Sequence, residues 1–235
     1  MHDFKFVSII LVCKGMEYKA VCRGLSRTTS SRLPSVIPIP VGIQSTTRYL
    51  ATWQQSGQFL NYPHPRVLVI GLCGGLNPRY QVGDIVLYQD CVYKRDGVYA
   101  VEHCDRGLTE LLYDRLQKQI STVKALTSDR VISSATEKHH LFQMSGADVV
   151  DMEGFAILEF FKQAQAPVTM LRVVSDDCYH DIPNFTSALS PDGSLQPLPV
   201  AIAMLRQPIA ATRMIRGSLR GLRVLEQLTT LLFSG

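Results

Sequence analysis

Two short stretches of the chain place acidic side chains where an apolar strand is expected to end. In the first, Glu153 follows Val149 and Val150 and precedes an apolar helix expected over 154–164. Ionised side chains are seldom buried without a partner, so this carboxylate needs a ligand or a counter-charge. The two adjacent hydroxyls of a ribose would be such a ligand. The alternatives are that Glu153 only caps the helix or pairs with Arg172.

The second stretch, from Leu171 to Asp177, has Arg172 inside an apolar strand and two acids at the end of that strand. An adjacent acid and a dry pocket both favour the protonated form of a carboxyl group, which is the form that a proton donor needs. Asp176 is therefore the candidate general acid. The alternative is an exposed turn in which these polar residues cap the chain.

The segments around these acids alternate between strand and helix patterns. Strands are expected over 6–12, 36–41, 66–72, 82–87, 123–126, 147–150 and 168–174, and helices over 16–25, 109–120, 134–144 and 154–164. Strands between 82 and 101 are expected to be antiparallel or at an edge. A further helix is expected to begin with hydroxyl caps at Ser45-Thr46-Thr47, and Cys73-Gly74-Gly75 is expected to form a tight turn. The pattern predicts an α/β fold of three layers, α/β/α, around a twisted mixed sheet whose strand ends gather the site.

The length of 235 residues favours a single domain over 1–235. The segment 178–199 is rich in Pro, Gly, Ser and Asp and is expected to be a loop or lid. The tail, 200–235, is expected to form one or two basic amphipathic helices interrupted near Pro208 and Gly217. The tail either packs on the core or lies on an anionic membrane surface.

Composition excludes several classes of protein. Apolar residues make up 46% of the chain and charged residues 19%, which is typical of a folded globular protein. The net charge of +4 comes from arginines in the tail, where no aromatic residue occurs before Phe233, so nucleic-acid binding is not expected. The six cysteines form no C-x-x-C pair, which favours reduced thiols, a cytoplasmic location and no metal. The apolar run from Phe6 to Cys13 is too short for a membrane span and lacks a signal-peptide cleavage site.

Four motifs together resemble the nucleoside phosphorylase and nucleosidase superfamily, especially its methylthioadenosine/S-adenosylhomocysteine nucleosidase branch. They are Met152-Glu153, Arg172-Val173-Val174-Ser175-Asp176, Gly71-Leu72-Cys73-Gly74-Gly75-Leu76 with Val82-Gly83-Asp84-Ile85-Val86, and, more weakly, Val41-Gly42-Ile43-Gln44. The resemblance covers about residues 6–178. It implies a phosphorylase-like fold and cleavage of an N-glycosidic bond in a purine nucleoside.

The resemblance also implies roles for single residues. Met152 would pack against the ribose and Glu153 would accept hydrogen bonds from its hydroxyls. Asp176 would protonate the purine, positioned by Ser175 and Arg172. The remaining candidates are the backbone at Gly42, Cys73 and Gly74, which would line the substrate, and Glu17, which would activate a water molecule.

Two of these carried-over roles have open alternatives. Glu17 stands at a helix start, where an acid also complements the helix dipole. The family more often has Ser-Ala-Gly where this chain has Leu72-Cys73-Gly74, so the base specificity stays open.

The attacking group and the substrate also stay open. Hydrolysis is favoured over phosphorolysis, because only Arg23 and Arg48 are cations near the early glycine turn that would hold a phosphate co-substrate. A non-catalytic nucleoside sensor is a further alternative. No metal or organic cofactor is expected, and a homo-oligomer is. The tail, Lys138 and Asp151-Met152-Glu153 resemble hopanoid-associated phosphorylase-like proteins, which implies an adenosyl lipid as a possible substrate and peripheral membrane contact through the tail.

Overall fold

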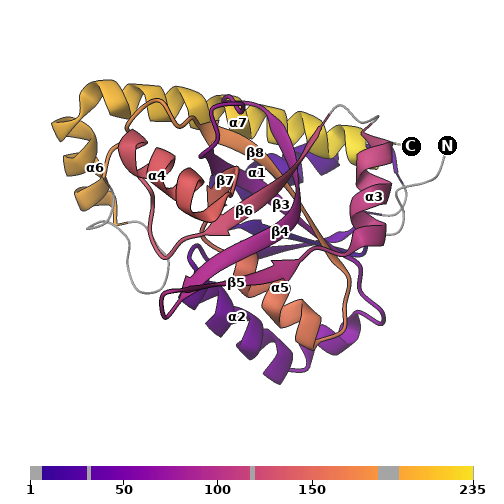
Figure 1. Ribbon diagram of the computed structural model, residues 1–235. Coiled ribbons are helices and arrows are strands. Elements are labelled where there is room, and N and C mark those ends of the chain that lie inside the picture. Colours follow the sequence, from indigo (N-terminus) through magenta and orange to yellow (C-terminus); the bar gives the residue numbers. More distant parts are fainter. Residues whose placement is uncertain (1–6, 31–32, 117–119, 185–195, 235) are drawn as a thin grey trace.

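The computed structural model describes residues 7–30, 33–116, 120–184 and 196–234. Eight strands form one mixed sheet, and helices cover both of its faces (Figure 1). The strands are β1 (Ile9–Cys13), β2 (Ser35–Ile39), β3 (Val67–Gly75), β4 (Ile85–Arg95), β5 (Val98–His103), β6 (Ser121–Thr127), β7 (Val149–Asp151) and β8 (Val168–Asp176). The helices are α1 (Met16–Ser26), α2 (Ile43–Gln55), the short 3-10 helix η1 (Gln58–Asn61), α3 (Arg106–Arg115), α4 (Ala135–Ser145), α5 (Gly154–Gln163), α6 (Pro197–Arg206) and α7 (Pro208–Phe233). The predicted three-layer α/β fold is confirmed.

The sheet closes on itself in part. β3 pairs with β7, β7 with β6, β6 with β4, β4 with β8, and β8 again with β3, while β2, β1 and β5 extend from this ring. β5 pairs antiparallel with β4 at the edge of the sheet, as expected for strands between 82 and 101, whereas β4 itself is an inner strand that also pairs with β6 and β8. Because β3 pairs with both β7 and β8, residues of these three strands are brought to one place.

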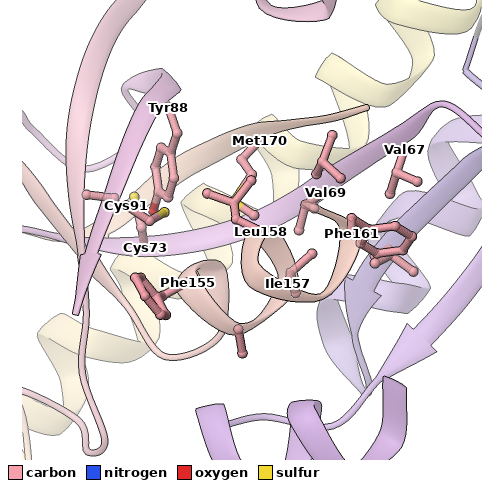
Figure 2. Close-up of a cluster of buried hydrophobic side chains, with 14 of the residues drawn as sticks. Val67, Val69, Cys73, Tyr88, Cys91, Phe155, Ile157, Leu158, Phe161 and Met170 are labelled. Atoms are coloured by element: carbon pink, nitrogen blue, oxygen red, sulfur yellow. The ribbon is translucent and has the colours of Figure 1, made fainter. Parts of the chain in front are cut away.

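Alternation along the central strands divides the core between the two faces. Ile9 and Leu11 pack with Trp53 and Phe161 on the face covered by α2 and α5, where Figure 2 shows Phe155, Ile157 and Phe161 under the sheet. The intervening residues of β1 and β3 pack on the other face against α1, α3 and α7. This period of two, with both faces buried, explains why the strands read as continuous apolar runs.

Several local expectations are corrected. Cys73-Gly74-Gly75 is not a tight turn, because all three residues continue β3 and pair with β7 or β8. The hydroxyls of Ser45-Thr46-Thr47 do not cap α2, which begins at Ile43. Thr46 and Thr47 instead donate to the Pro40 and Ile43 carbonyls.

The C-terminal segment also differs in detail. Pro208 separates α6 from α7, but Gly217 lies inside α7 and does not interrupt it. The helix α6 begins at Pro197, inside the segment expected to be a loop, and residues 185–195 of that segment lie outside the described residues. Leu222, Leu225, Leu228 and Leu232 of α7 are buried against α1 and the sheet, so this helix is part of the core.

Glycine lets α7 approach the end of β8 closely. A Cβ atom at Gly217 would overlap the Ser175 carbonyl oxygen, and one at Gly221 would lie 2.9 Å from the Cδ2 atom of Leu72. Gly217 and Gly221 are four residues apart and therefore share one face of the helix. Helix α7 thus packs its backbone at Gly217 directly against the backbone of Ser175, a predicted site residue.

We predict that Gly217→Ala lowers the free energy of unfolding by about 1 to 3 kcal/mol, because the added methyl forces the helix away from the Ser175 carbonyl. Gly107→Ala is the matched control, since Gly107 is also helical and a Cβ there would meet only Asp105 Oδ1 at 3.5 Å. The control should be neutral or slightly stabilising. Urea unfolding of both variants measures the difference, and equal stabilities would contradict the close approach.

Candidate active site

A buried arginine of β8 gathers three acids, one from α1, one from the end of β7 and one from the junction before α5. Arg172 is 1% exposed, and its Nη2 atom lies 3.4 Å from Asp151 Oδ2 and 3.9 Å from Glu153 Oε2. A Cβ at Gly71 would overlap both the Arg172 guanidinium and the Glu17 carboxylate, so these two groups meet over that glycine. Glycine in the middle of β3 is therefore required by the close approach of two charged side chains.

Each acid around Arg172 is also held by a backbone or hydroxyl donor. Glu153 Oε1 accepts from the Gly42 N–H at 2.8 Å, and Glu17 Oε2 accepts from the Leu72 N–H at 3.0 Å. Asp151 Oδ1 accepts from Thr127 Oγ1 at 2.8 Å and from a backbone N–H at 3.1 Å. These bonds fix the carboxylates, which is the pre-organisation that binding or catalysis on a sugar would need.

Burial changes the proton affinity of two of these acids. It raises the pKa of Glu153 to about 7, against the opposing influence of Arg172 and the Gly42 N–H. Burial also raises the pKa of Glu17, while Arg172 and the Leu72 N–H lower it. Glu153 is thus poised near neutrality, where a small change in its surroundings changes its charge.

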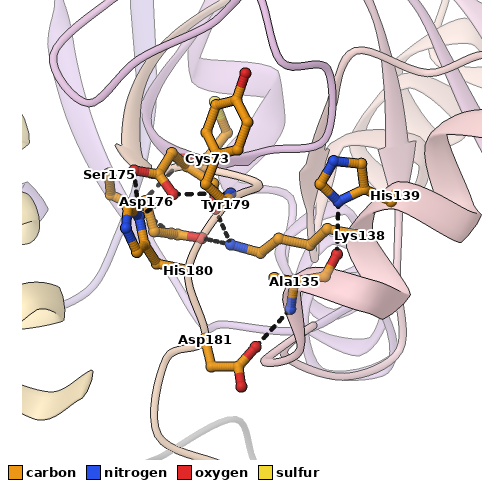
Figure 3. A network of polar contacts seen from close by, with 10 residues as sticks. Cys73, Ala135, Lys138, His139, Ser175, Asp176, Tyr179, His180 and Asp181 are labelled. Atoms are coloured by element: carbon orange, nitrogen blue, oxygen red, sulfur yellow. Dashed lines mark hydrogen bonds and ion pairs between the residues drawn. The ribbon is translucent and has the colours of Figure 1, made fainter. Parts of the chain in front are cut away.

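A second polar cluster lies at the end of β8 (Figure 3). Ser175 Oγ is 2.8 Å from Asp176 Oδ1 and 3.2 Å from the Cys73 carbonyl oxygen. The Asp176 carboxylate lies over Gly74, where a Cβ would be 3.0 Å from Oδ2. The same oxygen, Oδ2, forms an ion pair with Lys138 of α4, whose side chain is fully buried.

The structure thus arranges the sequence candidates in two groups joined by β3. Glu17, Glu153, Arg172 and Gly42 lie in the arginine cluster, and Ser175, Asp176, Cys73 and Gly74 lie in the second cluster. Met152 lies beside Glu153 in the chain and is half-buried. The two clusters meet along the strand, because Gly71 pairs with Arg172 and Gly74 with Asp176.

One expectation about this site is corrected. Arg172 does not position Asp176, because its contacts are with Asp151 and Glu153; the cation at Asp176 is Lys138. The Asp177 carboxylate accepts a hydrogen bond from the Tyr179 N–H and lies 2.8 Å from His180 Nδ1. Asp177 therefore has partners of its own, separate from those of Asp176.

Sequence reasoning missed Asp151 and Lys138 as parts of the site. A cation inside an apolar strand needs an acid, and Asp151, two residues before Glu153, was a further acid that could meet that need. Lys138 precedes Leu141 and Phe142 by three and four residues and shares the face that packs on the core. A lysine on such a face was the available signal.

Comparison with known proteins gives the family. The family model described as "Phosphorylase superfamily" matches residues 59–190, and the chain belongs to this superfamily. It is thus an enzyme of the class that acts on N-glycosidic bonds. A search of curated proteins finds no match.

Among solved structures, the 5'-methylthioadenosine/S-adenosyl homocysteine nucleosidase of Helicobacter pylori is 13% identical with a TM-score of 0.67, covering 96% of this chain and 97% of its own. The nucleosidase of the same name from Campylobacter jejuni is 13% identical with a TM-score of 0.61, covering 94% of this chain and 99% of its own. The futalosine hydrolase of H. pylori is 13% identical with a TM-score of 0.61, covering 91% of this chain and 97% of its own. At this identity the likeness establishes a common fold.

We predict that Glu153 makes stability fall as the pH rises. With a pKa of about 7 in the folded chain and about 4.5 when unfolded, the folded chain alone keeps this proton between those values. The stabilising contribution is complete below pH 4.5 and is lost as the pH rises through 7. Glu153→Gln keeps the acceptor for Gly42 but cannot titrate. The stability of wild type minus that of the variant should fall by about 2 to 3 kcal/mol from pH 5 to pH 8 in urea unfolding. Parallel pH curves would contradict the buried, titrating carboxyl.

Proposed function

We propose that the protein is a nucleosidase that hydrolyses the N-glycosidic bond of an adenosine-like purine nucleoside. The observation that carries the proposal is the pair of carboxylate clusters joined by β3, one built on Arg172 and the other on Asp176. Cleavage of a nucleoside needs a stabilised positive charge on the sugar and a proton for the departing base.

The arginine cluster suits the sugar end of that reaction. In the proposal Glu153 accepts hydrogen bonds from the ribose hydroxyls, Met152 packs against the ring, and the carboxylate stabilises the oxocarbenium-like transition state. Gly42 keeps Glu153 Oε1 in place at 2.8 Å. Because burial raises the pKa of Glu153 to about 7, the active ionised form increases as the pH rises through neutrality.

The Asp176 cluster suits the base end. In the proposal Asp176 delivers a proton to the purine, Ser175 orients its Oδ1 atom, and the strand backbone at Cys73 and Gly74 lines the base and sugar. Glu17, held by the Leu72 N–H at 3.0 Å, would take the proton of the attacking water. Burial raises the pKa of Glu17, which brings a carboxylate closer to the proton affinity that a general base needs near neutral pH.

Water is the proposed attacking group. Glu17 at the site supplies a base for water, and the neighbouring solved structures are named as nucleosidases and a hydrolase. Phosphorolysis is the alternative, with phosphate as a co-substrate, and a nucleoside sensor without turnover is a second one. No metal or organic cofactor is proposed, and the cytoplasmic location stays a prediction.

The test is a substrate panel of methylthioadenosine, S-adenosylhomocysteine, adenosine and inosine, with and without phosphate. We expect base release that does not depend on phosphate. On the best substrate, Glu153→Gln and Asp176→Asn should each lower kcat by about 100-fold or more. Release only with phosphate identifies a phosphorylase. Thermal stabilisation by nucleosides without release identifies a sensor, and full activity of both variants refutes the assigned roles.

We further propose that the substrate enters from an anionic membrane surface on which α6 lies. Three large apolar residues of α6 at helical spacing, Leu198, Ile202 and Leu205, are exposed by 42 to 80%, and Ile209 at the start of α7 is 75% exposed. Five exposed arginines follow, Arg206, Arg213, Arg216, Arg220 and Arg223, and no acid occurs between Asp192 and Glu226. An apolar face beside unbalanced positive charge suits anionic lipid, whereas a second copy of the same face would be repelled.

A cleft lies beside this surface, with Ile209 and Arg213 in its wall. It has a volume of about 480 Å³ and lies between Tyr179–Asp181, just after β8, and Gln207–Ala210 at the start of α7. His180 at its wall contacts Asp177, the neighbour of Asp176. An adenosyl headgroup with an apolar 5' chain would fit this cleft. No helix in the described part of the chain has the length and apolarity that a bilayer-spanning helix needs.

We predict that the protein floats with vesicles containing phosphatidylserine, less so at about 0.5 M salt, and not with phosphatidylcholine alone. The double variant Ile202→Asp, Leu205→Asp should abolish flotation. Leu60→Asp is the matched control, because Leu60 is 82% exposed and lies on η1. Flotation unaffected by the double variant would contradict the proposal. Light scattering on the same proteins without vesicles measures the expected homo-oligomer. Loss of the oligomer in the double variant would assign the α6 face to a second copy instead.

A further inference from the structure

Lys138 is a buried charge that the reaction proposed above does not use. Its side chain is fully buried, and its Nζ atom donates to Asp176 Oδ2 and, at 2.7 Å, to the Asp177 carbonyl oxygen. Removing an ammonium group from water is costly unless it is paired and hydrogen-bonded. A lysine held in this way at the candidate acid calls for a role at that acid.

Each carboxylate oxygen of Asp176 accepts a hydrogen bond in this arrangement. The Ser175 hydroxyl donates to Oδ1 at 2.8 Å, and the Lys138 ammonium donates to Oδ2 (Figure 3). Both oxygens accept hydrogen bonds here, so the proton that the proposed general acid gives to a base needs a source. The Nζ atom of Lys138 already carries a proton directed at Oδ2.

We propose that Lys138 is the proton source behind Asp176, a role that rests on the nucleosidase function proposed above. The Nζ–H bond breaks and an Oδ2–H bond forms, which leaves a neutral amine and a neutral acid. That O–H bond then breaks as an N–H bond forms on the purine. The electron pair of the glycosidic bond stays with the purine nitrogen. Water returns a proton to Lys138 after the base has left.

The position of α4 does not depend on Lys138 alone. The Ala135 N–H donates to Asp181 Oδ1 at 2.7 Å, and the Ile182 N–H donates to the Ser133 carbonyl oxygen at 2.9 Å. Ser134 caps the helix through the Glu137 N–H. These contacts join α4 to the segment after β8, so a variant at Lys138 can keep the local fold.

Three variants separate proton supply from positioning. Lys138→Met removes the charge with an unbranched side chain of similar length. Lys138→Arg keeps a cation beside Asp176 but does not release a proton in proteins. Lys124→Met is the matched control, because Lys124 Nζ donates to the Ser145 carbonyl at 2.9 Å, at the other end of α4.

The substrates are the purine nucleoside that the wild type cleaves fastest and 4-nitrophenyl β-D-riboside, whose nitrophenolate leaves without being protonated. Lys138→Met and Lys138→Arg should both lose about 100-fold or more in kcat on the nucleoside, which is the usual value of general acid help, and keep the nitrophenyl activity. Lys124→Met should keep both activities.

Each other result contradicts the proposal. Equal loss on both substrates shows that Lys138 only supports the structure. Wild-type activity of Lys138→Arg on the nucleoside shows that Lys138 only positions Asp176, and wild-type activity of Lys138→Met shows that it does neither. A wild type that cleaves the nitrophenyl riboside but no nucleoside refutes the nucleosidase function itself, and with it the role of Lys138.

Discussion

The buried guanidinium of Arg172 is the group on which the arrangement of this site depends. It is 1% exposed, so its charge is stable only because Asp151, Glu153 and Glu17 surround it. Those acids come from α1, the end of β7 and the junction before α5, and all must reach one point over β3. The partial closure of the sheet makes this possible, since β3 contacts both β7 and β8.

Glycine is the second requirement of the same geometry. Gly71 admits two charged side chains over β3, and Gly74 admits the Asp176 carboxylate two strand positions beyond Leu72. Gly217 of α7 admits the Ser175 carbonyl from the opposite direction. At each position a methyl group would occupy space that a polar site group now fills. Gly71 and Gly74 therefore make room for site groups within β3. The expected turn at 73–75 is absent because the strand continues to Gly75.

The sequence predicted the layers and most strands and helices, and it indicated two acids as site candidates, because continuous apolar runs and acids at strand ends are local signals. It could not predict which charges meet. Arg172 was assigned to Asp176 because the family resemblance implied it. The two residues are four apart along β8, where side chains lie on one face of the strand without their ends meeting. Lys138 reaches Asp176 across 38 residues of chain. Ring closure of the sheet, which makes that contact possible, leaves no local trace in the sequence.

The two clusters differ in their balance of charge. Cleaving a sugar–base bond separates charge, with positive charge growing on the sugar and negative charge on the base. The arginine cluster has three acids to one cation, and burial raises the pKa of Glu153 to about 7, so added positive charge nearby would be stabilised there. The other cluster pairs one acid with one cation, and Lys138 suits a base that gains negative charge. Strand β3 separates the two by the length of Leu72-Cys73-Gly74, so a nucleoside lying along this strand would meet an excess of acid at its sugar and a cation at its base.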